Sequence, residues 1–162
     1  MSRFATRRRM LAMLLLALWW GGFSFYAGRV VFIGHEVLSS KVRQGFITER
    51  VTNEFNCLAV VALALVGWEL AATQWSSRTR RGVWFAWGTA VAATVALFFL
   101  HAKLGSLLDF SARQVADDLR FYDWHRTYLW TATVQWFAGT TVLVALLSTT
   151  NSAPASNHDS AG

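Results

Sequence analysis

Four long apolar runs constrain this chain more than any other feature of its sequence. They cover residues 10–33, 57–75, 83–100 and 128–147, and no other stretch is as long and as apolar. A helix needs about 20 apolar residues to cross roughly 30 Å of hydrocarbon. Each run is long enough for one crossing. The sequence therefore predicts an all-α, polytopic integral membrane protein whose four spans form an antiparallel transmembrane four-helix bundle.

The division into domains follows from these spans. We expect residues 1–148 to form one four-span membrane domain, since 54% of the chain is hydrophobic, more than a soluble domain of this size buries. The remaining residues, 149–162, are small and polar, and we expect them to form a disordered cytoplasmic tail.

The charges gather beside the spans instead of forming a face that binds nucleic acid. The formal net charge is +6, and arginines cluster at 7–9 and 78–81. Such clusters usually set the orientation in the membrane, and these two lie beside the first span and in a short loop. We therefore expect a multi-pass protein of a bacterial inner membrane, with both termini cytoplasmic and no nucleic-acid partner. The single cysteine, Cys57, excludes an internal disulfide and a cysteine-based metal cluster.

The first run has an alternative interpretation as a cleaved signal peptide, because three arginines precede it. However, its apolar stretch exceeds the roughly 7–15 residues of a signal core, and no clean small-residue cleavage site ends it. We expect it to be retained as a span.

Three histidines stand at the same predicted membrane level. His35 ends the first span, His101 ends the third and His125 precedes the fourth, so all three lie at the outer ends. Imidazoles bind zinc, copper and haem iron, which makes these histidines candidate metal ligands. No two of them are three or four residues apart, so no local motif supports a metal. The absence of such a motif favours a structural polar network at these histidines. A metal or haem site and a substrate pocket are the two other interpretations that remain open.

Other polar residues accompany the histidines. Gln44, Thr48, Thr52 and Asn56 follow four-residue steps, a stripe of hydrogen-bonding groups that should not face lipid. The helix of the second span is therefore expected to begin well before Cys57. A second stripe runs from His125 through Tyr128, Ala132 and Gln135 to Gly139. The predicted outer polar cluster comprises Arg29, Glu36, Gln44, Thr48, Asp123, Arg126 and Gln135.

Arg126 has two interpretations. It is expected either to pair with Asp123 or Glu36, fixing the helix ends, or to hold a lipid phosphate at the interface.

Glu69 is an acid inside the second span, near its inner end. A carboxylate there is costly and usually faces the bundle or a cavity. We favour a residue that reaches water or pairs with Arg78 over a role in handling protons or ions.

Two shorter patterns predict local structure. Gly21, Ser24 and Gly28 share one face of the first span, where another backbone is expected to approach closely. The stretch SARQVADDLR, residues 111–120, carries capping-box spacing and predicts a short interfacial helix.

Three stretches, LWWGGFSFYAGRVVFIGHEVL, QGFITERVTNEFN and FYDWHRTYLWTATVQW, carry a family resemblance. Across about residues 10–147 the chain resembles bacterial four-span membrane proteins of the domain of unknown function 4149 family, and more distantly the membrane region of copper-resistance protein D. The resemblance implies a four-helix membrane bundle without an established activity. The copper-linked relatives favour a ligand site at His35 or His125, and no catalytic residue carries over.

These patterns together predict a binding or accessory role at the outward-facing cluster, for a metal ion or a small molecule. A purely structural or assembly protein and a haem-dependent redox protein are the alternatives. No hydrolase motif, glycine-rich phosphate loop or nucleophile elbow supports an enzyme. The expected partners are the lipid bilayer and a second copy or another membrane protein.

Overall fold

The computed structural model describes residues 3–38, 41–73, 75, 77–109, 114–115 and 118–150. Helix α1 covers Arg3–Phe25, the π-helix η1 covers Tyr26–Val30, and α2 covers Val31–Leu38. The chain continues through α3 (Lys41–Ala72), α4 (Ser77–Gly105), strand β1 (Leu108–Asp109), strand β2 (Gln114–Val115) and α5 (Asp118–Thr150).

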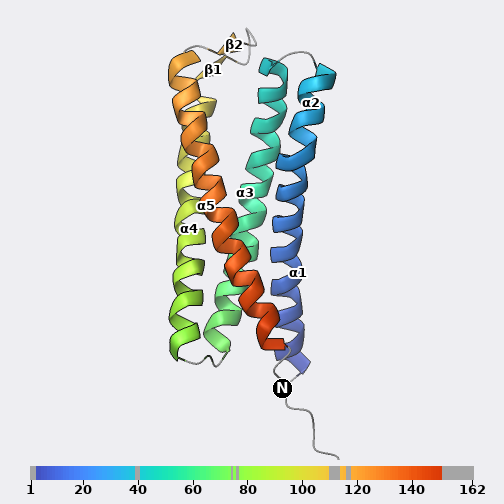
Figure 1. Ribbon diagram of the computed structural model, residues 1–162, viewed down its shortest axis with the longest axis vertical. Helices are drawn as coiled ribbons and strands as arrows, with labels where there is room; N and C mark the ends of the chain where they lie inside the picture. Colours follow the sequence, from blue (N-terminus) through green and yellow to red (C-terminus); the bar gives the residue numbers. More distant parts are fainter. Residues whose placement is uncertain are drawn as a thin grey trace, which may run out of the picture.

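The helices form an antiparallel four-helix bundle, as predicted. α1, η1 and α2 follow one another as a single rod, and α3, α4 and α5 supply the other three (Figure 1). The first rod packs against α3 and α5, and α4 packs against the same two helices. We call the end of the bundle that carries β1 and β2 the hairpin end, and the opposite end, where α1 begins and α5 finishes, the terminal end.

All four rods are long and apolar enough to cross a membrane. The candidate spans are Arg3–Leu38, Arg43–Ala72, Thr79–Gly105 and Leu119–Ser148. They support a multi-pass membrane protein, and they extend beyond the apolar runs of the sequence. The prediction that the second helix begins well before Cys57 is confirmed, because α3 begins at Lys41. α5 likewise starts at Asp118, before the fourth apolar run, and continues to Thr150. Of the predicted tail, residues 151–162 lie outside the described part of the chain.

The predicted short helix over residues 111–120 is wrong. β2 pairs antiparallel with β1, with Leu108 opposite Val115 and Asp109 opposite Gln114, and α5 already begins at Asp118. A capping-box spacing expresses only a local preference, and here the backbone pairs across the loop instead.

The core of the terminal half consists mainly of buried aliphatic and small side chains from all four rods. Leu16 of α1, Val66 of α3 and Val142 of α5 have no exposed surface and belong to one cluster. Many large apolar side chains face outward, among them Phe85 and Phe99 of α4, and a bilayer would cover them.

Some glycines lie where a side chain of a neighbouring helix packs against the backbone, but these are not the glycines predicted. A Cβ added at Gly139 would lie 2.7 Å from the Trp19 ring, and one added at Gly67 would lie 2.7 Å from the Trp87 ring. In contrast, a Cβ at Gly21 or Gly28 meets no atom within 4 Å. The close approach predicted at the Gly21, Ser24 and Gly28 face is therefore wrong at both glycines. A stripe of small residues permits close packing but does not choose the partner.

Candidate functional site

One cavity at the hairpin end contains all three candidate histidines. Its volume is about 390 Å³, and His35, His101, His125, Gln44, Thr48 and Tyr128 are among its lining residues. We call it the histidine pocket. Its walls come from η1 and α2, the first turns of α3, the last turns of α4 and the first turns of α5.

The up-and-down topology explains why these histidines meet. His35 lies near the end of α2, His101 lies near the end of α4 and His125 lies near the start of α5. In an antiparallel bundle these three positions fall at the same end.

His101 has a partner that the sequence does not single out. Its Nε2 lies 3.1 Å from Oε1 of Glu49, so the pair joins α4 to α3, and Glu49 also lines the pocket. Glu49 follows Thr48 directly, beside the polar stripe of α3. Glu49 also lies three residues before Thr52, so it shares the side of α3 that carries Thr52, and this spacing is the signal that would have found it.

The polar stripe of α3 faces the bundle, as predicted. Gln44, Thr52 and Asn56 are all buried. The Tyr26 hydroxyl donates to Thr48 Oγ1 at 3.2 Å, which joins η1 to α3.

The stripe also forms hydrogen bonds with α5 and between its own members along α3. Asn56 Nδ2 donates to the Tyr128 hydroxyl at 3.4 Å, and Gln44 Nε2 donates to Thr48 Oγ1 at 3.4 Å. The pocket wall is therefore cross-linked between helices by neutral hydrogen bonds.

The rings of His35 and His125 remain available to a ligand. Neither forms a hydrogen bond or an ion pair with another side chain in the described ranges, although both line the pocket. The His125 ring stacks on Phe121, with ring centroids 5.9 Å apart and planes 11° from parallel. This contact orients the imidazole and leaves both ring nitrogens for hydrogen bonding.

The geometry does not assemble a metal centre from the described residues. Within them, no group of three His, Cys, Asp or Glu side chains lies close enough to hold one metal ion. His35, His101 and His125 share a cavity without sharing a coordination sphere, and His101 lies against Glu49. Metal or haem binding at these histidines stays a prediction.

Five members of the predicted polar cluster do not line the pocket, and four of these are exposed. Arg29, Glu36, Asp123 and Arg126 are exposed, and the ion pairs seen among the described side chains do not include Arg126. The reason is helical geometry. Successive residues point about 100° apart around a helix, so Glu36 and Arg126 point away from the cavity that half-buried His125 and exposed His35 line.

Gln135 lies deeper than the pocket and joins two helices. Its side chain is 2% exposed, and its Nε2 donates to Thr94 Oγ1 of α4 at 2.7 Å. It shares the inward face of α5 with Tyr128, Ala132 and Gly139, as the predicted stripe requires.

Glu69 lies toward the terminal end and pairs with an arginine other than the one predicted. Arg8 Nε donates to its Oε2 at 2.7 Å, and Thr73 Oγ1 donates to its Oε1 at 2.9 Å. Arg8 also lies over the Trp68 ring, 5.7 Å from its centroid. The side chain of Arg78, the predicted partner, lies outside the described residues. The interpretation of Glu69 as a paired acid therefore fits, with Arg8 as its partner.

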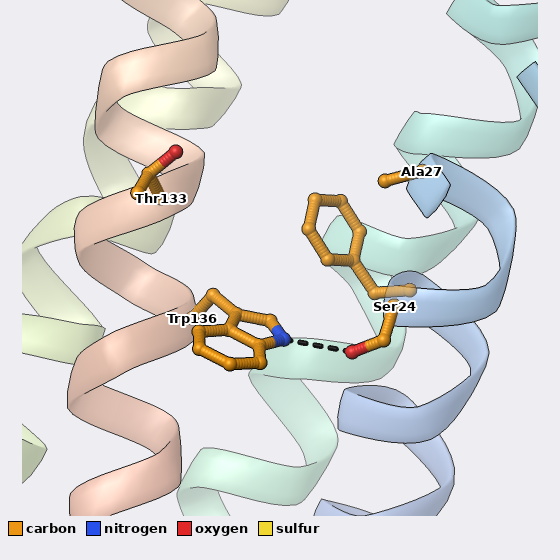
Figure 2. A pocket seen from close by; sticks show the side chains of 5 residues that line it. Ser24, Ala27, Thr133 and Trp136 are labelled. Atoms are coloured by element: carbon orange, nitrogen blue, oxygen red, sulfur yellow. Dashed lines mark hydrogen bonds between the residues drawn. The ribbon is translucent and has the colours of Figure 1, made fainter. Parts of the chain in front are cut away.

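A second cavity opens on the side of the bundle between α1 and α5. It measures about 260 Å³ and is lined by Phe23, Ser24, Ala27, Thr133 and Trp136. We call it the side groove. Figure 2 shows Trp136 of α5 facing Ser24 of α1, and the Trp136 Nε1 donates to Ser24 Oγ at 2.7 Å.

The π-helix η1 borders both cavities, and no periodicity in the sequence indicates it. Its residue Ala27 lines the histidine pocket and the side groove, and Tyr26 lines the histidine pocket. Single π-helical turns within α-helices are frequent at functional sites.

No family model, no curated protein and no solved structure matches this chain. The resemblance to the domain of unknown function 4149 family therefore stays a prediction.

Proposed function

We propose that this chain is a membrane protein that binds a small molecule in the histidine pocket. One observation carries the proposal: histidines from three different helices line one cavity of about 390 Å³. Ligand pockets typically measure about 300–1,000 Å³ and combine an apolar lining with a few polar groups that fix orientation. Leu104, Phe121 and Ala132 supply apolar lining here.

The orientation is part of the proposal. Placing both termini in the cytoplasm of a bacterial inner membrane puts the arginines at 7–9 and 78–81 on the cytoplasmic side. The histidine pocket would then open toward the outer leaflet. A ligand would reach it from outside the cell or from the bilayer.

A structural or assembly role is the second candidate, because the pocket wall is itself bonded between helices. His101 pairs with Glu49, Tyr26 donates to Thr48, and Asn56 donates to Tyr128. Such contacts would hold a bundle together without any ligand.

Native mass spectrometry of the full chain, purified from its own membrane in mild detergent, separates the two candidates. We would compare the wild type with His35→Ala, His101→Ala and His125→Ala. Metal analysis and an absorption spectrum of each sample would identify a metal or haem as the bound group.

Matched controls exist beside each histidine. Glu36→Ala, Lys103→Ala and Arg126→Ala change exposed residues that do not line the pocket. The proposal expects a bound molecule in the wild type and the controls and its loss from the three histidine variants. Empty protein throughout, with lower stability of His101→Ala, would support the structural role instead.

A further inference from the structure

We propose that the ligand is a neutral amphiphile whose polar head lies in the histidine pocket and whose apolar tail lies in the side groove. The inference rests on the proposed function for the position of the head. It adds the chemical class of the ligand and the route by which the ligand arrives.

The first support is that the two cavities are adjacent and share part of their wall. Phe23 and Ala27 line both of them. On α5 the histidine pocket ends with Leu129 and Ala132, and the side groove continues with Thr133 and Trp136. Thr133 lies four residues after Leu129, and Trp136 lies four residues after Ala132. The groove therefore extends the pocket along α5 by one helical turn, about 5.4 Å.

The second support is that the groove opens sideways, toward the position of the lipid. Ala27, Leu129 and Thr133 are exposed although they line the cavities. An apolar chain in this groove would contact α1 and α5 on one side and lipid tails on the other. It would therefore reach the pocket without crossing water.

The groove has a floor. The Trp20 and Trp136 rings stack with centroids 5.2 Å apart, and Trp20 Nε1 donates to Thr140 Oγ1 at 2.8 Å. Together with the bond from Trp136 to Ser24, these contacts close the space between α1 and α5 toward the terminal end. The part of a long tail next to the head group would therefore occupy the groove. The rest of the tail would extend into the bilayer on the hairpin-end side of Trp136.

The lining of the pocket selects the head group. Hydrogen bonds are offered by His35, His125, Gln44 and Tyr128, and among the described lining residues none is Lys or Arg. Glu49, the one carboxylate among these described residues, would repel a phosphate, and none of them is a fixed cation that would offset the desolvation of that phosphate. A carbonyl or hydroxyl head meets imidazole and amide groups without these penalties.

Photocrosslinking of the full chain in phosphatidylcholine nanodiscs tests the inference. The probe is monooleoylglycerol with a diazirine in its acyl chain, and the labelled residues are mapped by mass spectrometry. Label is expected on Phe23, Ala27, Thr133 and Trp136. Competition by unlabelled monooleoylglycerol and by a decyl-substituted benzoquinone distinguishes a glycerolipid head from a quinone head.

Two variants locate the tail and the head. Thr133→Trp fills the groove, and His125→Ala removes a group that contacts the head. Each variant is expected to lower labelling about tenfold, which corresponds to about 1.4 kcal/mol of binding free energy. Val134→Trp is the matched control, since Val134 is the next residue, is exposed and does not line the groove.

Four results would overturn the inference. The first is labelling spread over lipid-facing residues such as Phe85 that unlabelled monooleoylglycerol does not reduce. The second is labelling of the groove that His125→Ala leaves unchanged. A third is equal competition by oleoyl lysophosphatidylglycerol, whose head is anionic. The fourth is equal competition by the benzoquinone without its decyl chain. That last result, with His125→Ala still lowering binding, would remove the tail site and leave the proposed function standing.

Discussion

His101 Nε2 lies 3.1 Å from Glu49 Oε1, so one contact joins the end of α4 to the start of α3 beside the histidine pocket. The Glu49 carboxylate binds one nitrogen of the His101 imidazole, and this contact fixes the orientation of that ring in the wall of the cavity. This contact makes Glu49 part of the candidate site, although it stands outside the polar cluster predicted from the sequence.

Glu49→Ala is expected to lower the free energy of unfolding by about 1 kcal/mol, the usual value of one hydrogen bond, and to weaken ligand retention. Glu49→Gln keeps an acceptor for the imidazole and should restore most of both. Thermal unfolding followed by tryptophan fluorescence measures the first effect, and native mass spectrometry measures the second. Glu54→Ala changes an exposed acid on the same helix and serves as the control. Equal behaviour of Glu49→Ala and Glu54→Ala would contradict the role of the pair.

The ion pair of Arg8 with Glu69 is expected to stabilise the terminal end. Glu69→Ala would leave the Arg8 guanidinium without its carboxylate between α1 and α3, at a loss of about 3 kcal/mol. Unfolding of the purified protein by denaturant measures the loss. Arg7→Ala, at the exposed neighbour of Arg8, should change stability little. A Glu69→Ala protein as stable as the wild type would show that the pair contributes nothing net.

Gly139→Ala is expected to destabilise the bundle by about 1–3 kcal/mol, the range for overpacking, because the new methyl group would lie 2.7 Å from the Trp19 ring. Gly88→Ala is the matched control, since a Cβ there meets nothing within 4 Å and alanine favours a helix over glycine. The midpoint of thermal unfolding should therefore fall in Gly139→Ala and stay the same or rise in Gly88→Ala. Identical midpoints would contradict the contact between α1 and α5.

The proposed orientation predicts which end of the bundle faces outward. In a Cys57→Ser background, Glu36→Cys and Asp123→Cys place single thiols at exposed positions of the hairpin end, and Arg81→Cys places one at the terminal end. A membrane-impermeant maleimide added to intact spheroplasts should label the first two and spare Arg81→Cys until the membrane is permeabilised. The reverse pattern would place the termini outside.

The sequence was sufficient for the parts of the fold that depend on periodicity. The apolar runs located the four spans, and the four-residue steps from Gln44 to Asn56 showed that α3 starts early and turns that face inward. The common level of His35, His101 and His125 follows from the same reasoning, because alternate spans bring their ends together.

The remaining features depend on packing, which periodicity does not encode. Which neighbour of a histidine faces outward depends on the rotation of each helix, so periodicity does not show that Glu36 and Arg126, members of the predicted polar cluster, lie outside the pocket lining. The pairing of Glu49 with His101 depends on how α3 meets α4. The side groove depends on the packing of α5 against α1, and the π turn at Tyr26–Val30 carries no sequence pattern that we recognise.

The central claim, that the histidine pocket holds a ligand, is tested most directly by native mass spectrometry of His125→Ala beside Arg126→Ala. These residues are adjacent on α5, yet His125 lines the cavity and Arg126 is exposed. We expect Arg126→Ala to retain the molecule bound by the wild type and His125→Ala to lose it. Retention by both variants, or its absence from the wild type, would contradict the claim.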